Sequence, residues 1–101
     1  MIKVKLNNDG NYIKEITITG HANYDVYGKD IVCASVSATV LTTINGIMAI
    51  DDSIILVSFL KDKININVKR NDNVSQTLLN NMISCLKEIE KEYPKNMKIY
   101  D

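Results

Sequence analysis

The sequence predicts an α+β domain with the element order ββαββαβ, in which a mostly antiparallel sheet packs with two helices. Three observations support this: strand-like alternation in two pairs of segments, two longer segments of helical character, and clusters of turn formers between them. A chain of 101 residues has room for one domain, so we assign 1–101 to a single domain. Its 46% hydrophobic and 24% charged residues are typical of one packed core.

The first predicted hairpin occupies the N-terminal fifth of the chain. Residues 2–6 alternate apolar side chains with lysines, and residues 7–10 are turn formers. Residues 12–19 are rich in β-branched side chains and stop at Gly20. The second strand therefore ends where His21 begins a new segment.

The predicted loop and first helix follow. In residues 22–29 the apolar side chains follow neither a helical nor a strand period, so we predict a loop. Asp30 then opens an apolar segment, 31–48, whose length and composition favour a helix. Apolar residues fall on nearly every side of it, so we expect cover on more than one face, by the sheet and by another helix or a second subunit.

The second half of the chain repeats the order of elements. Segments 54–60 and 64–70 predict a hairpin, and 74–93 carries apolar residues at helical spacing before Pro94 ends it. Residues 97–100 can form a last edge strand.

Charge and composition exclude several function classes. Twelve basic and twelve acidic side chains cancel, with pI ≈ 6.6, so the basic surplus of a nucleic-acid-binding protein is missing. There is no signal-like N-terminus, and uninterrupted apolar runs fall short of the roughly 20 residues of a membrane span. We expect a cytoplasmic protein with no membrane or nucleic-acid partner. The sequence has no CxxC or HxxxH spacing, so no metal or cofactor is expected.

The single histidine, His21, and Cys33 are the candidate reactive pair. With Asp30 as N-cap, Cys33 falls in the first turn of a helix, whose terminus contributes about 0.3–1 kcal/mol toward a thiolate. That lowers a thiol pKa by less than about one unit. An imidazolium about 4 Å away contributes on the order of 4 kcal/mol at an effective dielectric of about 20. A nucleophilic Cys33 therefore needs His21 as base and then as general acid.

Spacing alone also allows structural roles for these residues. A cysteine in an apolar helix is usually packing, as we expect for Cys85 within the second helix, and Asp30 is most simply an N-cap. Asp30 could instead orient His21. Ser37 is a polar residue one turn beyond Cys33.

The sequence of residues 20–37 favours the catalytic roles of His21 and Cys33 over the structural ones. The string GHANYDVYGKDIVCASVS closely resembles the GHA…G.DIVCA.VS signature of the bacterial ribosomal-processing cysteine protease family. The resemblance implies that His21 is the catalytic histidine and Cys33 the nucleophile, and that Gly20, Asp30 and Ser37 occupy supporting motif positions. The loop departs from the family pattern at Asn23 and Asp25.

The resemblance further implies a homodimeric endopeptidase. Its substrate would be the large-subunit ribosomal protein numbered twenty-seven, from which it would remove a short N-terminal extension by cutting after an aromatic residue. We also expect residues 22–29 to form a mobile flap over this peptide, with Gly28 as a hinge and Tyr24 and Tyr27 covering a substrate side chain.

Two other functions fit the residues. One is a non-catalytic module that binds a ribosomal protein or RNA during ribosome assembly, although the neutral charge argues against RNA. The other is a thiol-dependent acyl hydrolase or transferase, which keeps the Cys–His pair and changes the substrate.

Overall fold

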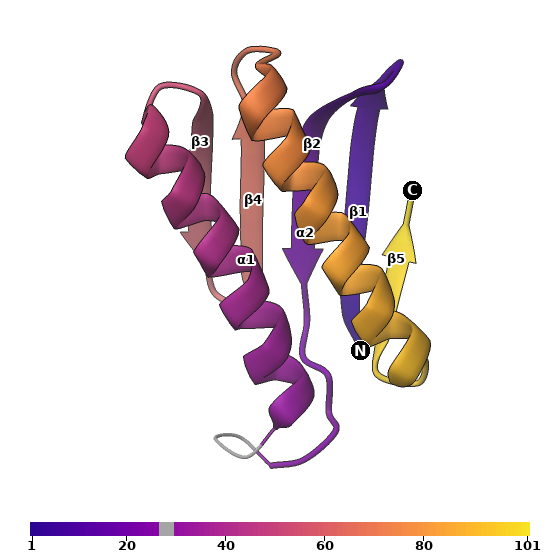
Figure 1. The fold of residues 1–101 in the computed structure, drawn as a ribbon. Coiled ribbons are helices and arrows are strands. Elements are labelled where there is room, and N and C mark those ends of the chain that lie inside the picture. Colours follow the sequence, from indigo (N-terminus) through magenta and orange to yellow (C-terminus); the bar gives the residue numbers. More distant parts are fainter. Residues whose placement is uncertain (27–29) are drawn as a thin grey trace.

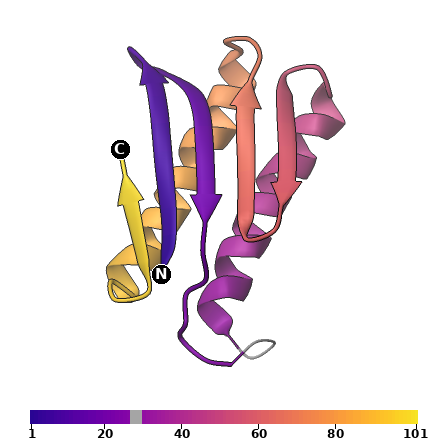
Figure 2. The ribbon, with the colours of Figure 1, turned by 180° about the vertical axis from the view of Figure 1, so that it is seen from behind.

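The computed structural model describes residues 1–26 and 30–101 and folds into two layers, a five-stranded sheet and two helices on one of its faces (Figures 1 and 2). Tyr27 and Gly28 of the predicted flap lie outside the described residues. The elements are β1 (Ile2–Asp9), β2 (Tyr12–Thr19), α1 (Ile31–Ile50), β3 (Ile55–Leu60), β4 (Lys63–Val68), α2 (Asn73–Glu92) and β5 (Met97–Tyr100). This confirms the predicted order. Most boundaries shift by one or two residues, but β1 runs on to Asp9 because residues 7–9, predicted as turn formers, still pair with β2.

The strands lie in the order β3-β4-β2-β1-β5. Every neighbouring pair is antiparallel except β1 and β5, which run parallel, so the prediction of a mostly antiparallel sheet is confirmed. The register pairs Thr19 of β2 with Lys63 of β4. This pairing matters for function, because it brings the turn between β3 and β4 beside the point where β2 ends.

Helix α1 buries one face. Its five buried residues follow one another at intervals of three or four, as one side of a helix requires: Val32, Val36, Val40, Ile44 and Ile47. The opposite face is exposed in the single chain, so sheet and α2 together provide only part of the cover that the sequence predicts.

The composition of α1 also meets the test for a membrane span. It is long and apolar enough, with a mean hydropathy of 1.7 over its best 18-residue window. This average does not conflict with the sequence prediction, which concerned the length of uninterrupted apolar runs. In the fold, only the buried face of α1 belongs to the core that it shares with the sheet and α2.

Helix α2 confirms its predicted apolar face with one exception. Leu79, Met82, Ile83 and Leu86 are buried, but Cys85 is exposed. The prediction that Cys85 is packed among its neighbours is therefore wrong. Position 85 lies on the flank of the helix, because the buried stripe follows the 79, 82, 83, 86 spacing.

Candidate active site

A cavity of about 740 Å³ lies between the N-terminal half of α1, the segment that follows β2, and the turn between β3 and β4. All but one of the predicted site residues that are described line it. The lining includes Gly20, His21, Asp30, Cys33 and Ser37. The thiol and the imidazole thus share one cleft, as the sequence predicts.

Cys33 sits where the first turn of α1 places it. Asp30 is the N-cap, with extended backbone, and its Oδ1 accepts hydrogen bonds from the backbone N–H groups of Val32 and Cys33, both at 3.0 Å. Its Oδ2 accepts from the N–H of Tyr24 at 3.0 Å. Both oxygens are thus occupied by backbone donors, so Asp30 supports the helix and the loop. None of these bonds involves His21, so the structure does not support the alternative that Asp30 orients His21.

The thiol of Cys33 is partly buried and accepts a hydrogen bond. The backbone N–H of Ala22 donates to Sγ at 3.3 Å, and the carbonyl of Ala22 accepts from Nδ2 of Asn96 at 3.0 Å. Burial raises the pKa of the Cys33 thiol, the Ala22 N–H lowers it, and the negative charge of Asp30 raises it again; the net direction is upward. Cys33 therefore rests as a neutral thiol at pH 7 and needs a base.

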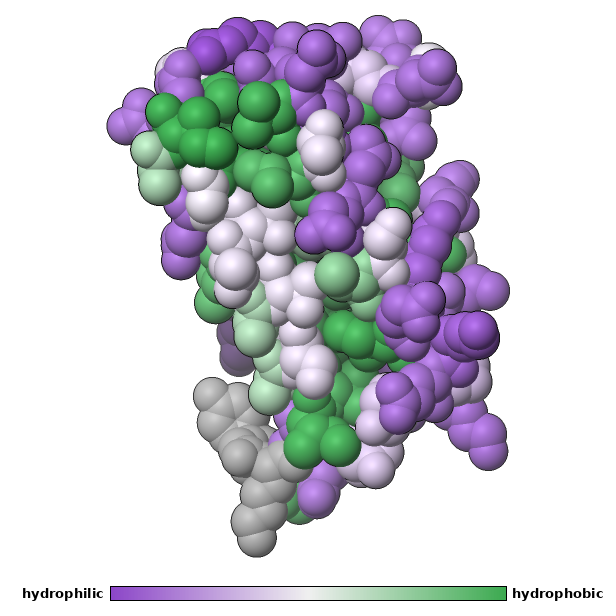
Figure 3. Space-filling model, viewed as in Figure 1, coloured by the Kyte–Doolittle hydropathy of each residue, from purple (hydrophilic) through white to green (hydrophobic). Residues whose placement is uncertain are grey.

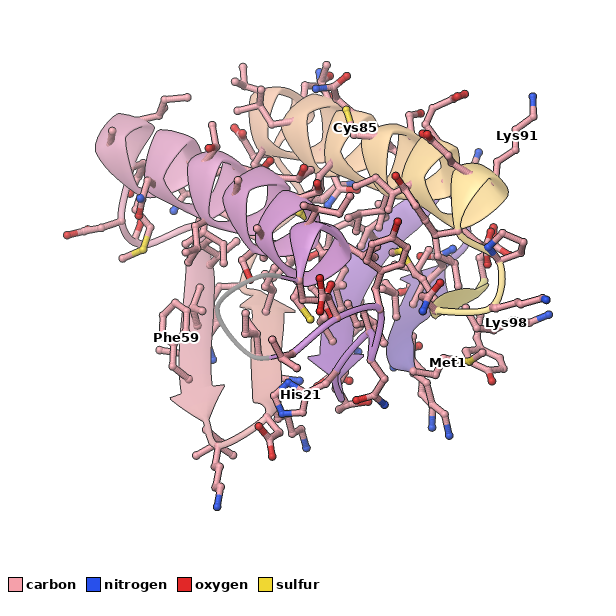
Figure 4. The ribbon with its side chains drawn as sticks, turned by 90° about the horizontal axis from the view of Figure 1, so that it is seen from below. Met1, His21, Phe59, Cys85, Lys91 and Lys98 are labelled. Carbon is pink, nitrogen blue, oxygen red and sulfur yellow. The ribbon has the colours of Figure 1, made fainter. Side chains whose placement is uncertain are left out.

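His21 is held by a residue that the sequence analysis missed. Its Nε2 lies 2.6 Å from Oδ1 of Asp62, in the turn between β3 and β4, and the two side chains are 54% and 47% exposed. Figure 4 shows His21 on the segment after β2, beside this turn. Within the described part of the chain, no hydrogen bond joins His21 to Cys33. Nothing local in the sequence singles out Asp62, which reads only as a charged turn residue.

Gly20 meets two geometric demands at the mouth of this cleft. Its φ of +87° lies in the region that glycine tolerates, and a Cβ there would overlap the carbonyl oxygen of Met1. Its N–H donates to the carbonyl of Asp62 at 3.0 Å. The motif glycine therefore joins the end of β2 to the turn that carries Asp62.

Of the other two predicted site residues that are described, Ser37 and Tyr24, only Ser37 lines the cavity. Ser37 is exposed and lines the cavity one turn after Cys33. Tyr24 does not line the cavity; its ring packs edge-on against Tyr93, with centroids 5.3 Å apart. Ala22, at the start of the predicted flap, is buried in the core.

The described residues contain no group of three or more His, Cys, Asp or Glu side chains that could hold a metal ion.

Comparison with known proteins identifies the family. The model of the family described as cysteine protease Prp matches residues 1–98. The ribosomal processing cysteine protease Prp of Staphylococcus aureus strain Mu50 is 28% identical over 95 residues, which cover 91% of this chain and 90% of the relative.

Two solved structures of the S. aureus ribosomal processing protease Prp have the same fold. The one with a covalently linked product peptide is 30% identical, with a TM-score of 0.91, and the match covers 98% of this chain and 97% of that one. The one with a substrate peptide is 28% identical, with a TM-score of 0.86 and coverage of 99% and 98%. With its thiol and its imidazole in one cleft, this chain belongs to the cysteine protease Prp family and is a cysteine peptidase.

Proposed function

We propose that this protein is an endopeptidase that uses Cys33 as nucleophile and His21 as general base and acid. The observation that carries the proposal is the cavity itself, which contains the thiol at the start of α1 and the chain's single imidazole. The upward shift of the Cys33 pKa adds a reason for the base, because a neutral thiol must lose its proton before it attacks.

The chemistry follows from these two groups. The imidazole of His21 takes the proton of the Cys33 thiol, and the thiolate attacks the scissile carbonyl carbon. When the tetrahedral intermediate collapses, the C–N bond breaks and the imidazolium gives its proton to the departing amine. A water molecule, deprotonated by His21, then attacks the thioester, which releases the acid product and restores the thiol.

Approach of the imidazole to the thiol is a required step. His21 is bonded to Asp62 in the free protein, so the Cys33–His21 hydrogen bond has to form when peptide enters the cavity. Catalytic hydrogen bonds are commonly long in free enzymes and tighten in the complex with substrate. The partial exposure of His21 leaves its ring room for this adjustment.

The substrate we propose is the N-terminal extension of the large-subunit ribosomal protein numbered twenty-seven, cut in the cytoplasm after an aromatic residue. Support comes from the relatives, which are named ribosomal processing proteases, and from the S. aureus protein, whose structure holds a substrate peptide. Exposed residues of α1, of the segment after β2 and of the turn between β3 and β4 line the cavity, so a peptide can enter it from solvent. A peptide therefore fits it better than the small substrate of an acyl hydrolase.

A cleavage assay tests both the reaction and the substrate. Purified protein is incubated with the extended and the trimmed forms of the ribosomal protein, and the products are identified by mass spectrometry. We expect cleavage of the extended form only, and its loss in Cys33→Ala and His21→Ala. Cys85→Ala is the matched control, because that thiol is exposed and does not line the cavity. Cleavage by Cys33→Ala at the rate of the unaltered protein would overturn the mechanism, and binding without cleavage would favour the assembly module.

We also propose a homodimer that covers the exposed face of α1. Leu41, Met48 and Ile50 are 39%, 42% and 59% exposed. Figure 3 shows hydrophobic side chains gathered on this face of the molecule around the C-terminal end of α1. Burying such side chains against a second copy removes apolar surface from water. Sedimentation equilibrium should give twice the chain mass, and Met48→Glu should shift the protein toward monomer.

A further inference from the structure

We propose that Asp62 is a positioning residue, which holds the imidazole of His21 in the orientation and tautomer that the reaction at Cys33 needs. This inference rests on the proposed function and names a third residue for the same site. It starts from one contact, the 2.6 Å approach of Asp62 Oδ1 to His21 Nε2.

The backbone on both sides of His21 is fixed to the two groups that the imidazole has to connect. On one side, the N–H of Gly20 is bonded to the carbonyl of Asp62 at 3.0 Å. On the other side, the N–H of Ala22 is bonded to Sγ of Cys33 at 3.3 Å. His21 therefore lies between the Asp62 turn and the thiol, and its side chain contacts the former.

The contact with Asp62 selects a tautomer. A carboxylate accepts hydrogen bonds only, so a neutral imidazole bonded to Asp62 carries its proton on Nε2. The other ring nitrogen, Nδ1, is then unprotonated, and no described residue donates a hydrogen bond to it. Nδ1 is the atom that can accept the proton of Cys33. When it has done so, the Asp62 carboxylate faces an imidazolium and stabilises its charge.

The fold places Asp62 here for reasons that do not depend on His21. Strands β2 and β4 are neighbours, and Thr19 pairs with Lys63, so the residue before Lys63 comes next to the residues after Thr19. Asp62 has a φ of +59°, a left-handed conformation that aspartate accepts more readily than most residues. The turn chemistry and the strand register together present its carboxylate to the imidazole.

The exposure of the pair limits the size of the effect. Ion pairs between half-exposed side chains contribute about 0–1 kcal/mol to stability, so loss of Asp62 should leave the fold intact. A buried triad carboxylate is worth about 10⁴-fold in kcat. For this pair, which water screens, we expect a loss of roughly 10-fold.

Two variants and one control test the role of Asp62. Asp62→Gly removes the carboxylate and suits the positive φ, while Asp62→Asn keeps the shape and an acceptor oxygen but loses the charge. Both keep the backbone carbonyl that Gly20 contacts. Lys61→Ala is the control, because it is in the same turn, is exposed and does not line the cavity.

The first readout is steady-state kinetics on the extended ribosomal protein. We expect Asp62→Gly to lower kcat roughly 10-fold with KM changed by less than about twofold, and Asp62→Asn to recover part of that loss. Lys61→Ala should match the unaltered protein. An unchanged kcat in Asp62→Gly would overturn the proposal. A raised kcat would also overturn it, because Asp62 would then hold His21 away from the thiol.

The second readout is the tautomer of the imidazole, measured by nitrogen-15 NMR. His21 is the only histidine, so its two ring nitrogens give an unambiguous signal. We expect Nε2–H as the neutral form in the unaltered protein, and a proton on Nδ1 instead would refute the assignment. This measurement needs no substrate, so a protein that fails to cleave the ribosomal precursor refutes the proposed function while Asp62 is still tested.

Discussion

Among the glycines that the structure describes, Gly20 is the one whose replacement by alanine should destabilise the protein most. An L-residue in a left-handed conformation costs about 1–2 kcal/mol. The new Cβ would also overlap the carbonyl oxygen of Met1, and the neighbouring Ile2 N–H is bonded to the carbonyl of Asn96 at 2.9 Å. Disturbing that bond adds about 1 kcal/mol, so we expect a loss of about 2–3 kcal/mol. At about 4–8 °C per kcal/mol for a domain of this size, the melting temperature should fall by roughly 10–20 °C.

Thermal unfolding followed by circular dichroism measures this loss, and two other glycines serve as controls. Gly10 has a φ of +63° with nothing within 4 Å of an added Cβ, so Gly10→Ala should show only the conformational cost of about 1–2 kcal/mol. Gly46 lies within α1 with open space around it, so Gly46→Ala should raise stability by about 0.5–1 kcal/mol. If Gly20→Ala and Gly10→Ala melt at the same temperature, the close approach of Met1 carries no weight and the reasoning is refuted.

Two pH-dependent predictions follow from the charged groups. Asp30→Asn should cap α1 equally well, but it removes a negative charge that raises the pKa of Cys33. In a Cys85→Ala background, iodoacetamide should therefore label Cys33 faster at pH 7. An unchanged labelling rate would contradict this. The hydrogen bonds from Ser53 and Arg70 lower the pKa of Asp51 to about 2. Because an unfolded aspartate titrates near about 3.9, Asp51 stabilises the fold above about pH 4 and loses this effect as the pH falls toward about 2. The melting temperature should therefore fall less in Asp51→Asn than in the unaltered protein over that range, and parallel curves would contradict the assignment.

Features that depend on near neighbours in sequence could be predicted. Asp30 caps α1 because an aspartate before an apolar helix bonds the N–H groups two and three residues on, and the structure has both bonds. That capping fixes Cys33 in the first turn. The strand pairs followed in the same way from alternation and turn formers.

Features that depend on which strands become neighbours could not be predicted. The order β3-β4-β2-β1-β5 inserts β4 beside β2, although about forty residues separate them. Only this order brings Asp62 to His21, so no reading of the turn between β3 and β4 alone reveals its contact. Cys85 shows a different limit, since helical spacing near the edge of an apolar stripe does not distinguish a buried position from an exposed flank.

The N-terminal position of Cys33 on α1 has two opposed effects on the thiol. The helix start favours a thiolate, yet burial raises the pKa of Cys33, and the nearby carboxylate that caps this helix raises it further. In the proposed mechanism, the free enzyme therefore keeps its nucleophile protonated and weakly reactive. We propose that peptide binding reverses this by bringing a proton acceptor to Sγ, namely Nδ1 of His21, whose Nε2 stays bonded to Asp62. On this proposal, formation of the thiolate is coupled to the arrival of a peptide, which would protect other proteins from an unselective thiol.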